Sequence, residues 1–232
     1  MVLSQVSITE GSDLLRWCSY WRDTLPGFQI GFPARLLRAQ RTAEWVRGNH
    51  AYLDVSSAEE LELMLSSGIP PVLVIVDTEG AATRTVWHAI GLGVGQLVVS
   101  HEREIQILSA MAQRPRRVLV DISDDHGEDL LGQVQAHLGL DNIGLRCRLC
   151  ADPVQDVDRV MGRIAELVDR RGLTATDLRL VVPKPQGHPP VEPCALATAI
   201  EHAHRRSYER YGRPPLAMGV SVDWQTLVAT QA

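Results

Sequence analysis

Two arginines with strand-like spacing are the first residues whose types and positions could do chemistry. Arg146 and Arg148 alternate on one face of a predicted strand, Ile143–Leu149. Like charges side by side on a strand face are costly unless water solvates them or an anion binds them. If this face points into the protein, the pair would hold a carboxylate or phosphate, whereas a face turned to solvent fits the spacing equally well. Lys184 is the only lysine among 23 basic residues, so chemistry that requires an amine side chain has one candidate.

Cysteines and histidines supply two further motifs, and both favour a structural interpretation. Cys147 and Cys150 have the CxxC spacing, but no second pair of ligands follows that would complete a tetrahedral zinc site. We expect Cys147 to be a small core side chain, and we expect no metal site. His202 and His204 lie two residues apart on a predicted helix, so they do not share a face and are expected to be solvated.

Three aspartates stand at or next to the carboxyl ends of predicted strands. They are Asp54, Asp77 and Asp121. In a parallel barrel this is the end where functional sites are built. Aspartate is also a common N-cap of the helix that follows a strand, and we expect that role for at least two of the three.

Apolar strands alternate with amphipathic helices along the whole chain. The strands are predicted to begin near residues 28, 52, 72, 96, 118, 143, 178 and 216. The helices between them are predicted over residues 34–47, 57–68, 82–90, 102–112, 130–138, 156–171 and 196–211. Continuous apolar strands, each followed by a helix, indicate a parallel sheet covered by helices. Eight such units in 232 residues predict an α/β fold of the (β/α)8 barrel class.

A helix over Ser12–Leu25 precedes the first predicted strand. We therefore expect an N-terminal segment, residues 1–27, packed on a single barrel domain formed by residues 28–232. The chain ends soon after the eighth strand, and this helix would cover the gap left by a closing helix. Trp17, Trp21 and Trp45 lie in the first two predicted helices. They are candidate anchors of a protein interface, or they simply pack against the barrel.

Composition excludes several classes of protein. The hydrophobic fraction of 45% and the charged fraction of 22% are ordinary for a folded globular chain. No apolar run is long enough for a membrane span and no secretory signal is visible, so we expect no membrane partner. A net charge of −5 argues against nucleic acid as a partner. Four cysteines fit a reducing compartment, and we expect a cytoplasmic protein.

Several segments, in consistent order, resemble the barrel domain of pyridoxal-phosphate-dependent decarboxylases of the diaminopimelate and ornithine type, which has the alanine racemase-like fold. The segment 54–61, DVSSAEEL, resembles the second strand and following turn of that family. The segment 143–150, IGLRCRLC, resembles its GLHCHIGS segment, and 177–182 resembles the approach to its phosphate loop. The resemblance implies a family whose barrels dimerise and which includes non-catalytic members, the antizyme inhibitors, that act by protein association. A shorter segment, 218–224, is similar to single-barrel pyridoxal-phosphate homeostasis proteins.

The departures from this family concern its chemistry. The family's Schiff-base lysine ends the first strand, where this chain reads FQIGFP over 28–33 and places Gly31 or a neighbour at that position. Arg146 and Arg148 replace the two histidines, one of which stacks on the cofactor ring. The phosphate-loop glycines become Val182-Pro-Lys-Pro185, in which each proline removes a backbone donor. The family's EPGR segment aligns near 222–225, and we expect its C-terminal β-domain to be missing.

These departures lead us to expect no bound pyridoxal phosphate and no catalytic residues. The leading hypothesis is a decarboxylase-like pseudoenzyme that acts through association, as a homodimer or with an active enzyme or another protein. The alternative is a barrel that binds a small anionic molecule through Arg146, Arg148 and Lys184, either as a carrier or as a remodelled enzyme. A working pyridoxal-phosphate decarboxylase that uses Lys184 is a third hypothesis.

Overall fold

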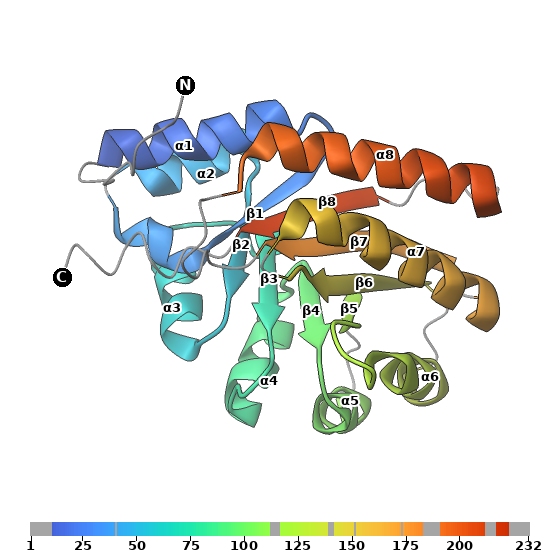
Figure 1. Cartoon of the computed structure of the whole chain (residues 1–232). Coiled ribbons are helices and arrows are strands. Elements are labelled where there is room, and N and C mark those ends of the chain that lie inside the picture. The colour runs from blue at the N-terminus through green and yellow to red at the C-terminus, as the bar shows by residue number, and fades with distance from the viewer. Residues whose placement is uncertain are drawn as a thin grey trace.

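A closed barrel of parallel strands forms the centre of the computed structural model, which describes residues 11–39, 41–111, 117–138, 142–150, 152–172, 174–182, 191–211 and 217–222. Within these residues eight strands pair in chain order, and β8 closes on β1, so the predicted (β/α)8 barrel is confirmed (Figure 1). The strands are β1 (Gln29–Pro33), β2 (Tyr52–Val55), β3 (Val74–Asp77), β4 (Gln96–Val99), β5 (Val118–Asp121), β6 (Asn142–Arg148), β7 (Thr174–Val182) and β8 (Ala217–Val222).

Helices cover the outside of the barrel. They are α1 (Gly11–Thr24), α2 (Thr42–Asn49), α3 (Ala58–Ser66), α4 (Thr83–Leu92), α5 (Glu102–Ser109), α6 (Gly127–Leu138), α7 (Pro153–Arg171) and α8 (Pro193–Tyr211). Two short 3-10 helices, η1 (Ala34–Arg38) and η2 (Pro71–Leu73), follow β1 and precede β3. Among the described residues, no helix is both long and apolar enough to cross a membrane.

Strand alternation divides the apolar residues into two cores. Outward-facing side chains such as Val74 and Val76 join the large core between barrel and helices. The inward-facing Ile75, Val98 and Leu119 form a separate small cluster inside the barrel, with Tyr52 packed against it. The rest of the described interior is largely polar, and this polar part includes the candidate site.

Helix α1 packs between α8 and α2 on the outside of the barrel, as expected for the N-terminal helix (Figure 1). Trp21 is only 1% exposed, and its ring lies 5.3 Å from that of Trp17. Phe32 of β1 stacks edge-on against both Trp17 and Trp45, with ring centroids 6.4 and 5.8 Å apart. Trp21 therefore packs against the barrel, the alternative that the sequence left open beside an interface role. Trp17 and Trp45 are half-buried, and their interface role stays a prediction.

The helix predicted over residues 34–47 is in fact two elements. The 3-10 helix η1 begins directly after Pro33 and ends at Ala39, whose backbone is extended. Helix α2 starts afresh after Arg41, which has a left-handed backbone with a φ of 65°. The apolar periodicity of this segment is continuous, so the sequence does not indicate the interruption between η1 and α2. The third strand also begins later than predicted, at Val74, because η2 occupies Pro71–Leu73.

Replacing Trp21 tests whether α1 is an integral part of the barrel. We expect Trp21→Ala to lower the free energy of unfolding by about 3–5 kcal/mol, the usual cost of truncating a fully buried aromatic side chain. The matched control is Trp87→Ala on α4, because Trp87 is 49% exposed and should change stability far less. The measurement is denaturant unfolding followed by circular dichroism. Equal, small losses in both variants would contradict the packing of α1.

Candidate active site

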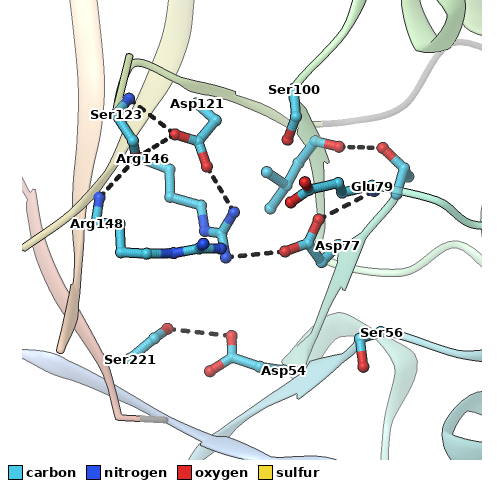
Figure 2. Close-up of polar contacts among 12 residues, drawn as sticks. Asp54, Ser56, Asp77, Glu79, Ser100, Asp121, Ser123, Arg146, Arg148 and Ser221 are labelled. Atoms are coloured by element: carbon cyan, nitrogen blue, oxygen red, sulfur yellow. Dashed lines mark hydrogen bonds and ion pairs between the residues drawn. The ribbon is translucent and has the colours of Figure 1, made fainter. Parts of the chain in front are cut away.

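An ionic cross-link spans the mouth of the barrel, at the carboxyl ends of the strands. The guanidinium of Arg146 donates from Nη1 to Asp121 Oδ2 at 2.7 Å and lies with Nη2 2.8 Å from Asp77 Oδ2. Figure 2 shows Arg146 lying between these two carboxylates. The three residues come from β6, β5 and β3. Strands β5 and β6 are neighbours, but β3 is separated from them by β4, so the contact with Asp77 reaches across the barrel. Arg146 is 8% exposed.

Both carboxylates are also fixed by their own loops. Asp77 Oδ1 accepts a hydrogen bond from the backbone N–H of Glu79 at 3.1 Å. Asp121 Oδ1 accepts one from the backbone N–H of Ser123 at 2.9 Å and a second from the Ser123 hydroxyl. Neither aspartate caps a helix, because α4 begins after Ala82 and α6 begins at Gly127. The predicted N-cap role of these aspartates is therefore wrong, and they belong to the site.

A second polar layer lies deeper in the barrel, around the buried Arg179 of β7. Its Nη1 donates to Ser221 Oγ at 3.2 Å, and Ser221 in turn donates to Asp54 Oδ1 at 3.1 Å. The guanidinium carbon of Arg179 lies 5.3 Å from the ring centroid of Tyr52, within cation–π range. Asp54 is not a helix N-cap either, because Ser57 caps the helix that follows it. Like Asp77, it lines the cavity at the mouth of the barrel.

Burial and charge act against each other in these two layers. Burial raises the pKa of Asp54, and the attraction of Arg179 and the Ser221 hydrogen bond offset this only in part. Burial likewise lowers the pKa of Arg179. For Arg146, burial also favours the neutral form, but Asp77 and Asp121 outweigh it and raise its pKa. Arg146 is therefore the firmly charged centre of the mouth.

Strand β1 presents no amine to the interior. A Cβ atom at Gly31 would stand 2.8 Å from Asp54 Oδ2, 2.8 Å from Ser221 Oγ and 3.0 Å from Arg179 Nη1. Gly31 therefore faces the barrel interior, and no larger side chain fits there without displacing the Asp54 layer. Two residues further along, Pro33 lines the mouth cavity. The chain's single lysine, Lys184, falls outside the described residues.

A small cavity remains above the cross-link. It has a volume of about 150 Å³, and its lining includes Asp54, Asp77, Arg146, Arg148 and Ser221. Both predicted arginines therefore reach the mouth, and the outward orientation left open by their spacing is excluded. The two arginines do not act together on an external anion, because Asp77 and Asp121 of the chain itself neutralise Arg146. The Arg148 guanidinium has no ion-pair partner among the described residues, and its backbone N–H donates to Ser123 Oγ at 2.8 Å.

Cys147 and Cys150 lie in different surroundings. Cys147 is 4% exposed in the outer core, where burial raises the pKa of its thiol to about 11, so its predicted core role is confirmed. Cys150 is exposed, and Arg159 Nη2 lies 3.6 Å from its Sγ.

Sequence reasoning missed Arg179 and Ser221, which order the deeper layer. One signal was present, since Arg179 is a lone charge within the apolar stretch 178–182. A lone arginine in a buried strand requires carboxylate or hydroxyl partners, and alternation places it on the same face as Val181.

The fold and the polar mouth define a (β/α)8 barrel whose buried charged side chains gather at the carboxyl ends of its strands. Residues 12–137 match the family model described as the pyridoxal-dependent decarboxylase, pyridoxal binding domain. The match covers more than half of the chain, and the chain belongs to this family. A diaminopimelate decarboxylase of Actinosynnema pretiosum subsp. auranticum is 33% identical over 103 residues, which are 44% of this chain and 24% of that protein.

Solved structures show the same fold at low sequence identity. The arginine decarboxylase of Paramecium bursaria Chlorella virus, solved with agmatine, superposes with a TM-score of 0.73 at 12% identity over 92% of this chain and 62% of its own. The lysine/ornithine decarboxylase of Vibrio vulnificus, solved with putrescine, gives a TM-score of 0.73 at 15% identity over 92% and 61%. The chain thus spans less than two thirds of the length of these structures.

The described residues do not fit pyridoxal phosphate, the cofactor that the family implies. Schiff-base formation requires an amine, and the inward positions of β1 carry Gln29, Gly31 and Pro33, none of which has one. The cavity of about 150 Å³ is smaller than the ~300–1,000 Å³ typical of cofactor pockets. Arg146 and its two carboxylates occupy the mouth itself.

The opposite surroundings of Asp54 and Asp156 predict opposite titrations. Burial raises the pKa of Asp54 above its ordinary value of 3.8. For Asp156, burial acts in the same direction, but hydrogen bonds from the Cys150 N–H and from Arg159 outweigh it and lower the pKa. Carboxyl-carbon NMR titration should therefore resolve Asp54 above 3.8 and Asp156 below it.

The sign of each contribution to stability follows from linkage. Asp54 favours folding when it is protonated, so its contribution is lost as the pH rises through its raised folded pKa. Asp156 stabilises the fold above pH 3.8, and that contribution is lost as the pH falls through its lower folded pKa. An Asp54 titration at or below 3.8 would show that the arginines outweigh burial, contrary to this account of the mouth.

Proposed function

We propose that this chain is a non-catalytic member of the decarboxylase family that acts through association with another protein chain. The observation that supports the proposal is the first strand, where Gly31 and Pro33 stand on the inner face of β1 and neither carries an amine side chain. The cross-link of Arg146 with Asp77 and Asp121 supports it, because the mouth is filled by the chain's own charges. The partner is a second copy of this chain, an active enzyme of the family or another protein.

Helix α1 and its surroundings are the part of the surface that we assign to this contact. Tyr20 of α1 is 38% exposed, and Trp17 of α1 and Trp45 of α2 are half-buried. Tyrosine and tryptophan are enriched among the residues that dominate binding energy at interfaces. The region assigned to the contact is residues 12–45.

A second candidate function is the binding of a small anionic molecule in the mouth. The observation that favours it is Arg148, whose guanidinium lines the cavity without an ion-pair partner among the described residues. Arg146 is committed to its two carboxylates, so Arg148 would make the main contact, and Lys184 stays a further candidate from the sequence. A cavity of about 150 Å³ suits a small carboxylate or phosphate better than a nucleotide.

Trapping with borohydride tests the absence of aldimine chemistry. The protein is incubated with pyridoxal phosphate, reduced with borohydride and measured as intact mass. We expect no stoichiometric adduct, because the described interior holds no lysine and Lys184 is the only lysine in the chain. A stoichiometric adduct on Lys184 would refute the non-catalytic assignment, and Lys184→Ala serves as the control for labelling at that site.

Association is tested by light scattering at micromolar concentration, together with co-purification from the native cell. We expect an oligomer, or a partner recovered in fixed ratio, and we expect Tyr20→Ala to weaken the contact at least tenfold, since a central aromatic anchor contributes ~2 kcal/mol or more. Trp87→Ala on α4, on the other side of the barrel in Figure 1, is the control and should leave association unchanged. A clean monomer without a partner, retaining a small molecule, would favour the second candidate function.

A further inference from the structure

The mouth contains a guanidinium site that is already filled. Two carboxylate oxygens, Asp77 Oδ2 and Asp121 Oδ2, lie 2.8 and 2.7 Å from separate terminal nitrogens of the same guanidinium (Figure 2). The planar fork of arginine matches two acceptors in this way, whereas the ammonium of lysine acts as a single point of charge. The site is therefore selective for the shape of the cation as well as for its charge.

The two carboxylates are held in position without Arg146. The second oxygen of Asp77 is fixed by the N–H of Glu79, and the second oxygen of Asp121 is fixed by the N–H and hydroxyl of Ser123. These are contacts of the loops that follow β3 and β5, and none of them involves the guanidinium. The remaining oxygens thus keep facing one another across the mouth even if the arginine side chain is removed.

An empty site would be costly to the fold. The side chains of Asp77 and Asp121 are only 19% and 12% exposed, so two partly desolvated negative charges would face each other. Asp54 lines the same cavity and would add a third carboxyl group. Breaking a buried pair by removing one partner is strongly destabilising, because the other charge stays behind without compensation.

We propose that Arg146 is a built-in occupant of this site, a tethered guanidinium that fills the mouth in the place where the family's barrels are expected to carry a ligand. It cross-links β3, β5 and β6 and so holds the mouth without any bound molecule. The site itself is a receptor for guanidinium compounds, and it becomes available when the side chain of Arg146 is taken away. This inference concerns how the mouth is held, and it stands or falls separately from the association proposed above.

Chemical rescue tests the proposal on the full-length chain. In Arg146→Ala we expect the melting temperature to fall by on the order of 10 °C. Guanidinium chloride at ~20 mM should raise it again by roughly 2–4 °C, the effect of a dissociation constant of about 5 mM, beyond any effect of equal sodium chloride or methylammonium chloride. At this concentration guanidinium is far too dilute to act as a denaturant.

Three variants separate this specific site from general loss of stability. Arg148→Ala removes a cation that lines the same cavity but has no ion pair among the described residues, so it should melt near wild type and show no guanidinium effect. Arg146→Lys should melt between wild type and Arg146→Ala. A triple variant, Arg146→Met with Asp77→Asn and Asp121→Asn, removes all three charges and should not respond to guanidinium.

The result that would overturn the proposal is a guanidinium response in Arg146→Ala no larger than that to sodium chloride. An Arg146→Ala protein as stable as wild type would overturn it equally. If Arg146→Ala does not fold in sodium chloride, the same titration is followed as recovery of the circular dichroism signal. Failure to recover at ~20 mM guanidinium, while Arg148→Ala is folded, would then contradict a preformed guanidinium site.

Discussion

The barrel depends on one electrostatic constraint, which is that a guanidinium buried in its mouth must be matched by carboxylates. Arg146 satisfies this requirement with Asp77 and Asp121, and the surrounding loops are arranged around the three groups. The Glu79 and Ser123 backbones turn their N–H groups toward the aspartates, and the backbone of Arg148 binds the same Ser123. The loops after β3 and β5 and the end of β6 therefore have coupled positions. The cavity that remains is small because this network fills the space.

The eight-stranded barrel could be predicted from the sequence because its signal is local and repeated. Each strand is a short apolar run, each helix has an amphipathic period, and their alternation leaves few possible architectures. The error at residues 34–47 has a physical cause. The predicted helix is interrupted at Arg41, whose backbone is left-handed. A glycine at this position would have indicated such a conformation, whereas an arginine does not.

Sequence patterns predicted where the site residues lie, but not how they pair. Sequence placed Asp54, Asp77 and Asp121 at strand ends and Arg146 and Arg148 on one strand face. It could not pair Arg146 with Asp77, because that contact crosses the barrel between strands separated by two others. From local spacing alone, the aspartates were predicted to be helix N-caps, and no acceptor was predicted for the arginines. A buried arginine inside a closed barrel nevertheless requires an acceptor. Counting charges on all inward faces together would have indicated their pairing.

The polar side chains packed around Gly31 restrict which residues this position of β1 can accept. A lysine at residue 31 would displace Asp54, Ser221 and Arg179 together, because all three side chains stand within 3.0 Å of where its Cβ would be. Removing Arg146 alone would leave Asp77 and Asp121 without their shared cation, which is strongly destabilising. An amine on the inner face of β1 would therefore require several coordinated substitutions rather than one, because the polar side chains around residue 31 would have to change with it.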